Sequence, residues 1–205
     1  MTSGNDVIRT WLDRATQILQ QHAAELDELD RQVGDGDHGS NMLRGFRAAR
    51  ESVIDADSPA QNVKHVGMAL VSNVGGASGP LYGTFLLRAG QVWESDVTTA
   101  SLARAMRRGL DGVVARGKAQ VGDATMVDAL APAVASLEAS AATDLDLTDA
   151  LAAAREAAAE GARSTAPLVA RRGRASYLGR ATVGHLDPGA VSSSLLLSTL
   201  SGDDA

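Results

Sequence analysis

The sequence predicts an all-α fold with eight helices. Apolar residues recur at the i, i+3 and i+4 positions of a helix from one end of the 205-residue chain to the other. Runs that alternate apolar and polar residues between hairpin turns, which are typical of β-strands, are missing. Proline opens three of the apolar stretches, as suits the first turn of a helix. At this length we expect residues 1–205 to form a single domain.

The first helix is expected to be long. Its apolar face runs over residues 7–29, and Ser3 and Asp6 have the spacing of a capping box in front of it. A second helix should begin near Ser40 or Asn41 and continue to about residue 54.

The third and fourth helices each begin near a proline. Ser58, Pro59 and Gln61 supply an N-cap, a first-turn proline and the partner of a capping box for a helix through residues 63–70. Pro80 stands in the first turn of a helix through residues 81–87.

Helices five and six are predicted from their caps. Thr98 or Thr99 can cap a helix that carries apolar residues over 102–113. Asp123 can cap the next helix, over 127–137, in which we expect a kink at Pro132.

The last two helices differ in composition. Asp146 or Thr148 opens an alanine-rich helix over residues 147–165, which we interpret as a packed helix rather than a solvated rod between domains. Asp187 and Pro188 open the final helix, whose apolar residues run over 191–200.

Composition excludes several classes of protein. The chain has no cysteine, so a disulfide framework, a thiolate metal site and a thiolate nucleophile are excluded, and a reducing cytoplasm is the expected location. A formal charge of −6 and only six aromatic residues argue against a nucleic-acid partner. No uncharged apolar run approaches the roughly 18 residues of a membrane span, so no membrane partner is expected.

The connection after the first helix carries three carboxylates, those of Asp30, Asp35 and Asp37. Because unpaired carboxylates at this spacing repel one another, we expect a positive charge among them. Oxygen ligands without thiolate favour Mg²⁺ or Ca²⁺. The alternative is an exposed acidic turn in which Asp35 and Asp37 only cap a helix.

Two other interpretations of this connection fail. An EF-hand needs glutamate at its twelfth position, where counting from Asp35 gives Phe46 and counting from Asp30 gives Asn41. Residues 34–39 match the dinucleotide pattern G-x-G-x-x-G, but they follow a helix instead of a strand, and their aspartates would repel a pyrophosphate.

Glycines gather in three further connections. Residues 75–83 place Ser78 before a helix N-terminus, which suits an anion, although glycines there could equally allow close helix packing. Residues 117–122 stand beside a basic pair, and residues 173–189 include Arg174, which could pair with phosphate or remain in a solvated basic turn. Met126 could contact an adenine or belong to the core, and His38 could be structural.

Taken together, these four connections resemble the ADP-binding L-subunit family of dihydroxyacetone kinases, a domain also found at the C-terminus of single-chain ATP-dependent dihydroxyacetone kinases. The matching stretches lie in the expected order between residues 30 and 190: GDGDHGSNM, NVGGASGPLYGTF, RGKAQVGDATMVDAL and RRGRASYLGRATVGHLDPGA. The resemblance implies an eight-helix antiparallel barrel whose loops at one end hold ADP or ATP and two Mg²⁺ ions.

The resemblance also implies the residues of this site. Asp30, Asp35 and Asp37 are the implied metal ligands, and no catalytic side chain is implied, because a positioned nucleotide and its metal ions suffice for transfer. The family often has alanine where Gly36 stands, which we expect to alter loop stiffness more than ligation. The implied nucleotide contacts are His38, Gly39, Ser40, Asn41, Ser78, Gly79, Gly117, Met126, Arg174, Asp187, Pro188 and Gly189.

The function that the resemblance implies needs two partners. A phosphohistidine on the M subunit, a protein of the phosphotransferase system, would rephosphorylate bound ADP, and the γ-phosphoryl would pass to dihydroxyacetone held on the K subunit. One alternative is a relative that uses free ATP with another acceptor. A second is a regulatory module that binds a transcription factor.

Overall fold

The all-α prediction is confirmed in the computed structural model, which describes residues 4–200. Within these residues there are eight α-helices, one 3₁₀ helix and no strand. The helices are α1 (Gly4–Val33), α2 (His38–Arg50), α3 (Pro59–Asn73), α4 (Ser78–Ala89), α5 (Thr99–Gly117), α6 (Met126–Ala142), α7 (Leu147–Arg163), η1 (Arg174–Thr182) and α8 (Pro188–Ser198).

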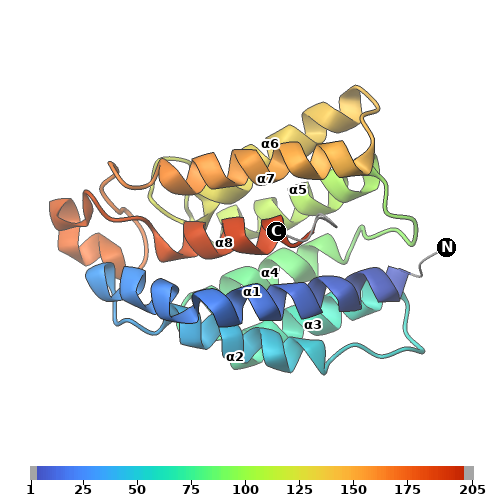
Figure 1. Ribbon diagram of the computed structural model, residues 1–205, viewed down its shortest axis with the longest axis horizontal. Helices are drawn as coiled ribbons and strands as arrows, with labels where there is room; N and C mark the ends of the chain where they lie inside the picture. Colours follow the sequence, from blue (N-terminus) through green and yellow to red (C-terminus); the bar gives the residue numbers. More distant parts are fainter. Residues whose placement is uncertain (1–3, 201–205) are drawn as a thin grey trace.

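The α-helices form an antiparallel bundle that closes into a barrel (Figure 1). Each α-helix from α1 to α6 packs against the next one, α7 packs against α8, and α8 returns to α1. The connections α1–α2, α3–α4, α5–α6 and α7–α8 therefore lie at one end, which is the left end in Figure 1. These are the four glycine-rich connections, so the alternation of direction alone brings them together.

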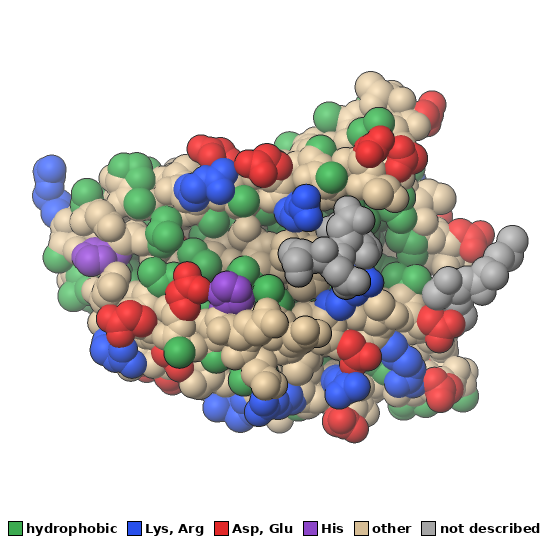
Figure 2. Space-filling model, in the orientation of Figure 1, with side chains coloured by type: hydrophobic (Ala, Val, Ile, Leu, Met, Phe, Trp, Pro, Cys, Tyr) green, Lys and Arg blue, Asp and Glu red, His purple; other side chains and the backbone are tan. Residues whose placement is uncertain are grey.

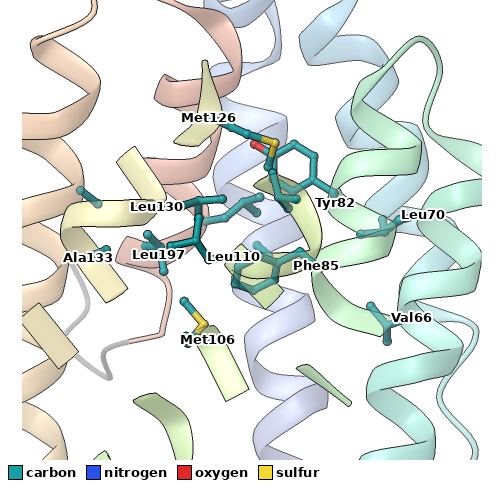
Figure 3. Close-up of a cluster of buried hydrophobic side chains, with 14 of the residues drawn as sticks. Val66, Leu70, Tyr82, Phe85, Met106, Leu110, Met126, Leu130, Ala133 and Leu197 are labelled. Carbon is teal, nitrogen blue, oxygen red and sulfur yellow. The ribbon is translucent and has the colours of Figure 1, made fainter. Parts of the chain in front are cut away.

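The core fills the inside of the barrel. Inward-facing side chains from α3, α4, α5, α6 and α8 meet in one cluster, part of which is shown in Figure 3. From α1, Leu12, Leu19 and Leu26 are fully buried at helical spacing, as the periodicity predicted. On the outside, charged side chains of both signs are interspersed (Figure 2). No helix in the described part of the chain has the length and apolar character that crossing a membrane requires.

Most helix starts agree with the sequence. The capping box of Ser58 and Gln61 is present, Thr98 caps α5, and Asp146 caps α7. The proposed cap at Ser3 lies outside the described residues. Pro132 lies inside α6, which continues on both sides of it.

The predicted cap of α6 was wrong. Thr125 is the N-cap, and it forms a capping box with Asp128. Asp123 is instead buried, where its carboxylate accepts hydrogen bonds from the Gln120 amide at 3.1 Å and from Nε of Arg172 at 3.2 Å. Asp123 thus joins the α5–α6 connection to the segment before η1.

The start and end of α2 also differ from the prediction, because the helix begins at His38 and ends at Arg50. The alanine-rich helix is packed, as predicted, and the alternative of a solvated rod was wrong. Its alanines at four-residue spacing are buried, and Gly161 lies so close to α6 that a Cβ would stand 2.1 Å from the carbonyl oxygen of Asp128. The 3₁₀ helix η1 was not predicted, since it has no apolar periodicity.

Candidate functional site

A cavity of about 580 Å³ opens at the end of the barrel where the four glycine-rich connections meet. All four connections contribute to its lining, as the resemblance implied. Most of the predicted site residues line it: Asp30, Asp35, Asp37, His38, Asn41, Ser78, Gly117, Met126, Arg174, Asp187, Pro188 and Gly189. The predicted contacts Gly39, Ser40 and Gly79 are not among the lining residues.

The three predicted metal ligands converge in this cavity. One carboxylate oxygen each of Asp30, Asp35 and Asp37 lies within 4.8 Å of the others. Oδ2 of Asp30 accepts hydrogen bonds from the amides of Gly36 and Asp37, at 2.9 and 3.0 Å, and so folds the loop. Gly36 has a φ of +77°, so alanine there would be strained. Three such oxygens suit a hard divalent cation.

The alternative of a simple helix-capping turn does not describe Asp37. This residue stands at the N-cap position of α2, but its side chain makes no capping hydrogen bond. Its carboxylate is therefore not engaged by the helix and is open to another ligand on the cavity side.

A cation of the protein itself already reaches the acidic loop. Arg174, at the start of η1, forms an ion pair with Asp35 across the cavity. The hydrogen bond from Arg174 is the main reason why the pKa of Asp35 lies below its ordinary value. Arg174 is thus not simply part of a solvated turn.

His38 is held by hydrogen bonds on both ring nitrogens. Its Nε2 lies 2.8 Å from Oγ of Ser192, and its Nδ1 lies 3.2 Å from Oγ of Ser78. Burial lowers the pKa of the imidazole, against the nearby carboxylates, which raise it. The ring is buried, lines the cavity and joins α2, α4 and α8.

The next two residues of α2 have contacts within the protein. A Cβ on Gly39 would stand 2.1 Å from the carbonyl oxygen of Ala23, so this glycine lets α2 approach α1. The amide and hydroxyl of Ser40 both donate to the carboxylate of Asp27, at 2.9 and 2.5 Å. Both residues therefore help to pack α2 onto α1, and their contact with a nucleotide stays a prediction.

The N-terminus of α4 faces the cavity beside the acidic loop. No side chain caps α4, so the amides of its first turn are not engaged by a capping residue. Such amides and the positive end of the helix dipole favour an anion. Gly79 serves packing here, because its Cβ would stand 2.3 Å from the carbonyl oxygen of Val74. The close packing that the sequence allowed is therefore present, and anion binding at the uncapped helix start stays a prediction.

The remaining wall comes from the starts of α6 and α8. Met126 lines the cavity and is also buried in the core, where Figure 3 places it above Tyr82. Asp187 caps α8 by accepting a hydrogen bond from the Ala190 amide at 2.7 Å. Desolvation raises the pKa of Asp187 to about 7.

Sequence reasoning missed the residues that support this wall. Asp123 and Arg172 hold the segment before η1. Tyr82 lines the cavity, and Ser192 and Ser193 lie buried behind it. A signal existed for the serines, because three consecutive serines, residues 192–194, interrupt the apolar residues of the last helix.

The fold and site define an all-helical domain in which an acidic loop and the N-termini of α2, α4, α6 and α8 share one cavity. A protein-family comparison matches residues 32–202 to the DAK2 domain, and the chain belongs to this family.

Two curated relatives differ in length. The ADP-binding subunit DhaL of the PEP-dependent dihydroxyacetone kinase of Escherichia coli (strain K12) is 43% identical over 205 residues, which cover 98% of this chain and 97% of the relative. L-erythrulose 1-kinase of Mycolicibacterium smegmatis is 38% identical over 196 residues, which cover 92% of this chain but 34% of that kinase.

The fold is also similar to a solved structure, that of the dihydroxyacetone kinase of C. freundii in complex with AMP-PNP and Mg²⁺. The TM-score is 0.75 at 29% identity, with 96% of this chain and 33% of that kinase chain covered. The chain thus spans about a third of that kinase.

Proposed function

We propose that this chain is the nucleotide-binding subunit of a PEP-dependent dihydroxyacetone kinase and that it keeps ADP bound as a cofactor at the end of the barrel. A full-length relative at 43% identity carries this role in its name, and the kinase structure from C. freundii binds AMP-PNP and Mg²⁺. The observation that carries the proposal is the convergence of three aspartate oxygens, within 4.8 Å of one another, with the uncapped start of α4 in a single cavity.

In this proposal some groups of the cavity would bind metal ions and others would bind phosphate. Asp30, Asp35 and Asp37 would hold two Mg²⁺ ions against the diphosphate, whose negative charge the ions neutralise. The first-turn amides of α4 and the hydroxyl of Ser78 would bind phosphate oxygens. The guanidinium of Arg174 would leave Asp35 and pair with phosphate.

The other predicted contacts would enclose the nucleotide. Asn41, Gly117, Met126 and the turn 187–189 line the cavity and would surround ADP, while Gly39, Ser40 and Gly79 would act by fixing the helix starts. No side chain needs to act as a nucleophile, because positioning and charge neutralisation carry phosphoryl transfer.

Two partners complete the reaction in this proposal. A phosphohistidine protein of the phosphotransferase system, the M subunit, would rephosphorylate the bound ADP. The K subunit would present dihydroxyacetone to the γ-phosphoryl group. Both would work in the cytoplasm and dock at the end of the barrel where the cavity opens. A transcription regulator as a further partner is a separate proposal on the same surface.

A second acceptor is favoured by one relative. Because L-erythrulose 1-kinase shares 38% identity with this chain, the ketose on the partner subunit could be L-erythrulose. The ketose would then be chosen by the partner, and the nucleotide site would be the same.

The test compares two charge-removing variants at opposite ends of the barrel. Phosphorus NMR of freshly purified protein should show retained ADP in the wild type and in the control Asp55→Asn. Asp55 lies in the α2–α3 connection, where it forms an exposed ion pair with Arg9 of α1. Asp35→Asn should retain none. Phosphoryl transfer from phosphohistidine to dihydroxyacetone or L-erythrulose should then be measured with both partners added. Retention of ADP by Asp35→Asn would refute the metal assignment, and a wild type without affinity for ADP would refute the function.

A further inference from the structure

A buried chain of hydrogen bonds runs from the middle of the barrel to the cavity. The hydroxyl of Tyr82 lies 2.7 Å from Oγ of Ser192 and 2.8 Å from Oγ of Ser193. Oγ of Ser192 lies 2.8 Å from Nε2 of His38, and Nδ1 of His38 lies 3.2 Å from Oγ of Ser78. At this end of the hydrogen-bond chain, His38 and Ser78 line the cavity, where they would face a phosphate.

This chain of hydrogen-bonded hydroxyls is unusual because apolar core side chains lie beside it. Phe85, one turn after Tyr82 on α4, lies in the apolar cluster, whereas the hydroxyl of Tyr82 points to the side of Met126 and the cavity (Figure 3). Ser192 is fully buried and Ser193 is 1% exposed. Buried hydroxyls are tolerated when they are hydrogen-bonded, and these hydroxyls are bonded mainly to one another.

Two directions are open to this chain, and they differ in which ring nitrogen of His38 carries the proton. In one direction Tyr82 donates to Ser192, its shortest contact at 2.7 Å, instead of to Ser193 at 2.8 Å or to the Gly189 carbonyl at 3.1 Å. Ser192 then donates to Nε2 of His38 at 2.8 Å instead of to the same carbonyl at 3.1 Å. Nε2 is then an acceptor, and the single ring proton of a neutral His38 must be on Nδ1, which donates to Ser78.

We propose that Tyr82 and Ser192 are positioning residues, which hold His38 as its Nδ1–H tautomer so that the hydroxyl proton of Ser78 points at a nucleotide phosphate. This inference rests on the proposed function, because it assigns the phosphate as the acceptor. When Nδ1–H donates to Ser78, the hydroxyl of Ser78 keeps its own proton for the cavity.

The opposite direction would work against an anion. If Ser78 donated to Nδ1, only its oxygen lone pairs would remain for the cavity, and these repel phosphate oxygens. The tautomer of His38 therefore decides whether Ser78 attracts the nucleotide.

Two adjacent serines provide a matched pair of variants. Ser192→Ala and Ser193→Ala each remove a buried hydroxyl of α8 that contacts Tyr82, but only Ser192 also contacts His38. Calorimetry with Mg²⁺ and ADP should show binding about tenfold weaker in Ser192→Ala, because the hydroxyl of Ser78 is then no longer oriented to donate to the charged phosphate. Binding by Ser193→Ala should stay within about twofold of the wild type. Adding Ser192→Ala to Ser78→Ala should cost nothing further.

The tautomer is measured directly by NMR of protein labelled with ¹⁵N-histidine, in which His38→Gln assigns the signal among the four histidines. We expect Nδ1–H at His38 in the wild type, with and without Mg²⁺ and ADP, and loss of that preference in Ser192→Ala. A proton on Nε2 of His38 in the wild type would overturn the proposal. This measurement needs no variant except His38→Gln, which assigns the signal. Equal weakening by the two serine variants would overturn it too. A wild type that fails to bind ADP would refute the proposed function, while the tautomer would still decide the direction of the chain.

Discussion

Arg174 and Asp35 form an ion pair that crosses the mouth of the cavity, from the first residue of η1 to the loop between α1 and α2. The pair joins two segments that are far apart in the sequence and meet only because the barrel closes. The guanidinium of Arg174 thus supplies positive charge beside the carboxylates of the acidic loop. In the proposed function Asp35 binds a metal ion and Arg174 binds a phosphate, so binding of Mg²⁺ and ADP must break this ion pair.

The change Arg174→Gln should therefore have opposite effects on the two ligands. Binding of Mn²⁺, used as a stand-in for Mg²⁺ in the absence of nucleotide, should become about threefold tighter, because a competing cation has gone. Binding of ADP with Mg²⁺ should become about tenfold weaker, because a charge-assisted bond to phosphate is lost. Electron paramagnetic resonance measures the first affinity and calorimetry the second.

The control for this prediction is Arg180→Gln, which removes the same charge from η1. Arg180 is exposed and lacks an ion pair among residues 4–200, so neither affinity should change by more than about twofold. If Arg174→Gln moved both affinities in the same direction, the exchange between carboxylate and phosphate would be refuted.

Much of the fold could be predicted because its helices carry local signals. The cap at Ser58 and the periodic leucines of α1 depend only on neighbours in the chain, so they are visible in the sequence. Asp123 was misassigned as a cap because its real role, a bond to Arg172, joins residues 49 positions apart. η1 was missed because its residues show no apolar periodicity.

The candidate site could be predicted only as a set of loops. Asp30, Asp35 and Asp37 are close in sequence, so their cluster was predictable from the residues alone. The contact between His38 and Ser192 joins α2 to α8. These two residues are 154 positions apart, and no local pattern in the sequence predicts their contact. Glycines were ambiguous for the same reason, since the close approach of Gly39 to the backbone of α1 is a contact that no local pattern predicts.

Gly39→Ala should destabilise the protein strongly. Its Cβ would stand 2.1 Å from the carbonyl oxygen of Ala23, so α1 and α2 would have to separate, at a cost of about 3 kcal/mol in the free energy of unfolding. Gly76→Ala is the matched change: φ is +63° there but no atom lies within 4 Å, so the cost should be about 1 kcal/mol. Urea denaturation measures both, and equal losses would contradict the close contact of the two helices.

Asp187 should make the ligand-free protein less stable as the pH rises. Its pKa is about 7 in the folded protein against about 3.9 in an unfolded chain. The folded state therefore holds more protons between these values, and the free energy of unfolding falls as the pH rises from 4 to 7. Asp187→Asn keeps an oxygen for the cap but cannot ionise. Its melting temperature should match the wild type near pH 4 and exceed it by roughly 5 °C at pH 8.

The control for the pH prediction is Asp146→Asn at the start of α7. Asp146 is also an N-cap, but it is exposed, and the amide of Asp149 lowers its pKa. Losing this charge should bring no gain in melting temperature at pH 8. If Asp187→Asn showed no more gain than Asp146→Asn, burial of the Asp187 charge would not be a source of instability.

Removal of metal and nucleotide should lower the melting temperature. A ligand that binds only the folded state at a hundred times its Kd adds about 2.7 kcal/mol, or about 5–10 °C for a chain of this length. Wild-type protein and Asp55→Asn should gain this shift with Mg²⁺ and ADP and lose it with EDTA, which leaves the three aspartates facing one another again. Asp37→Asn should gain little, because one ligand oxygen loses its charge. A full shift in Asp37→Asn, or a shift in the wild type that survives EDTA, would show that ADP binds without the aspartate cluster.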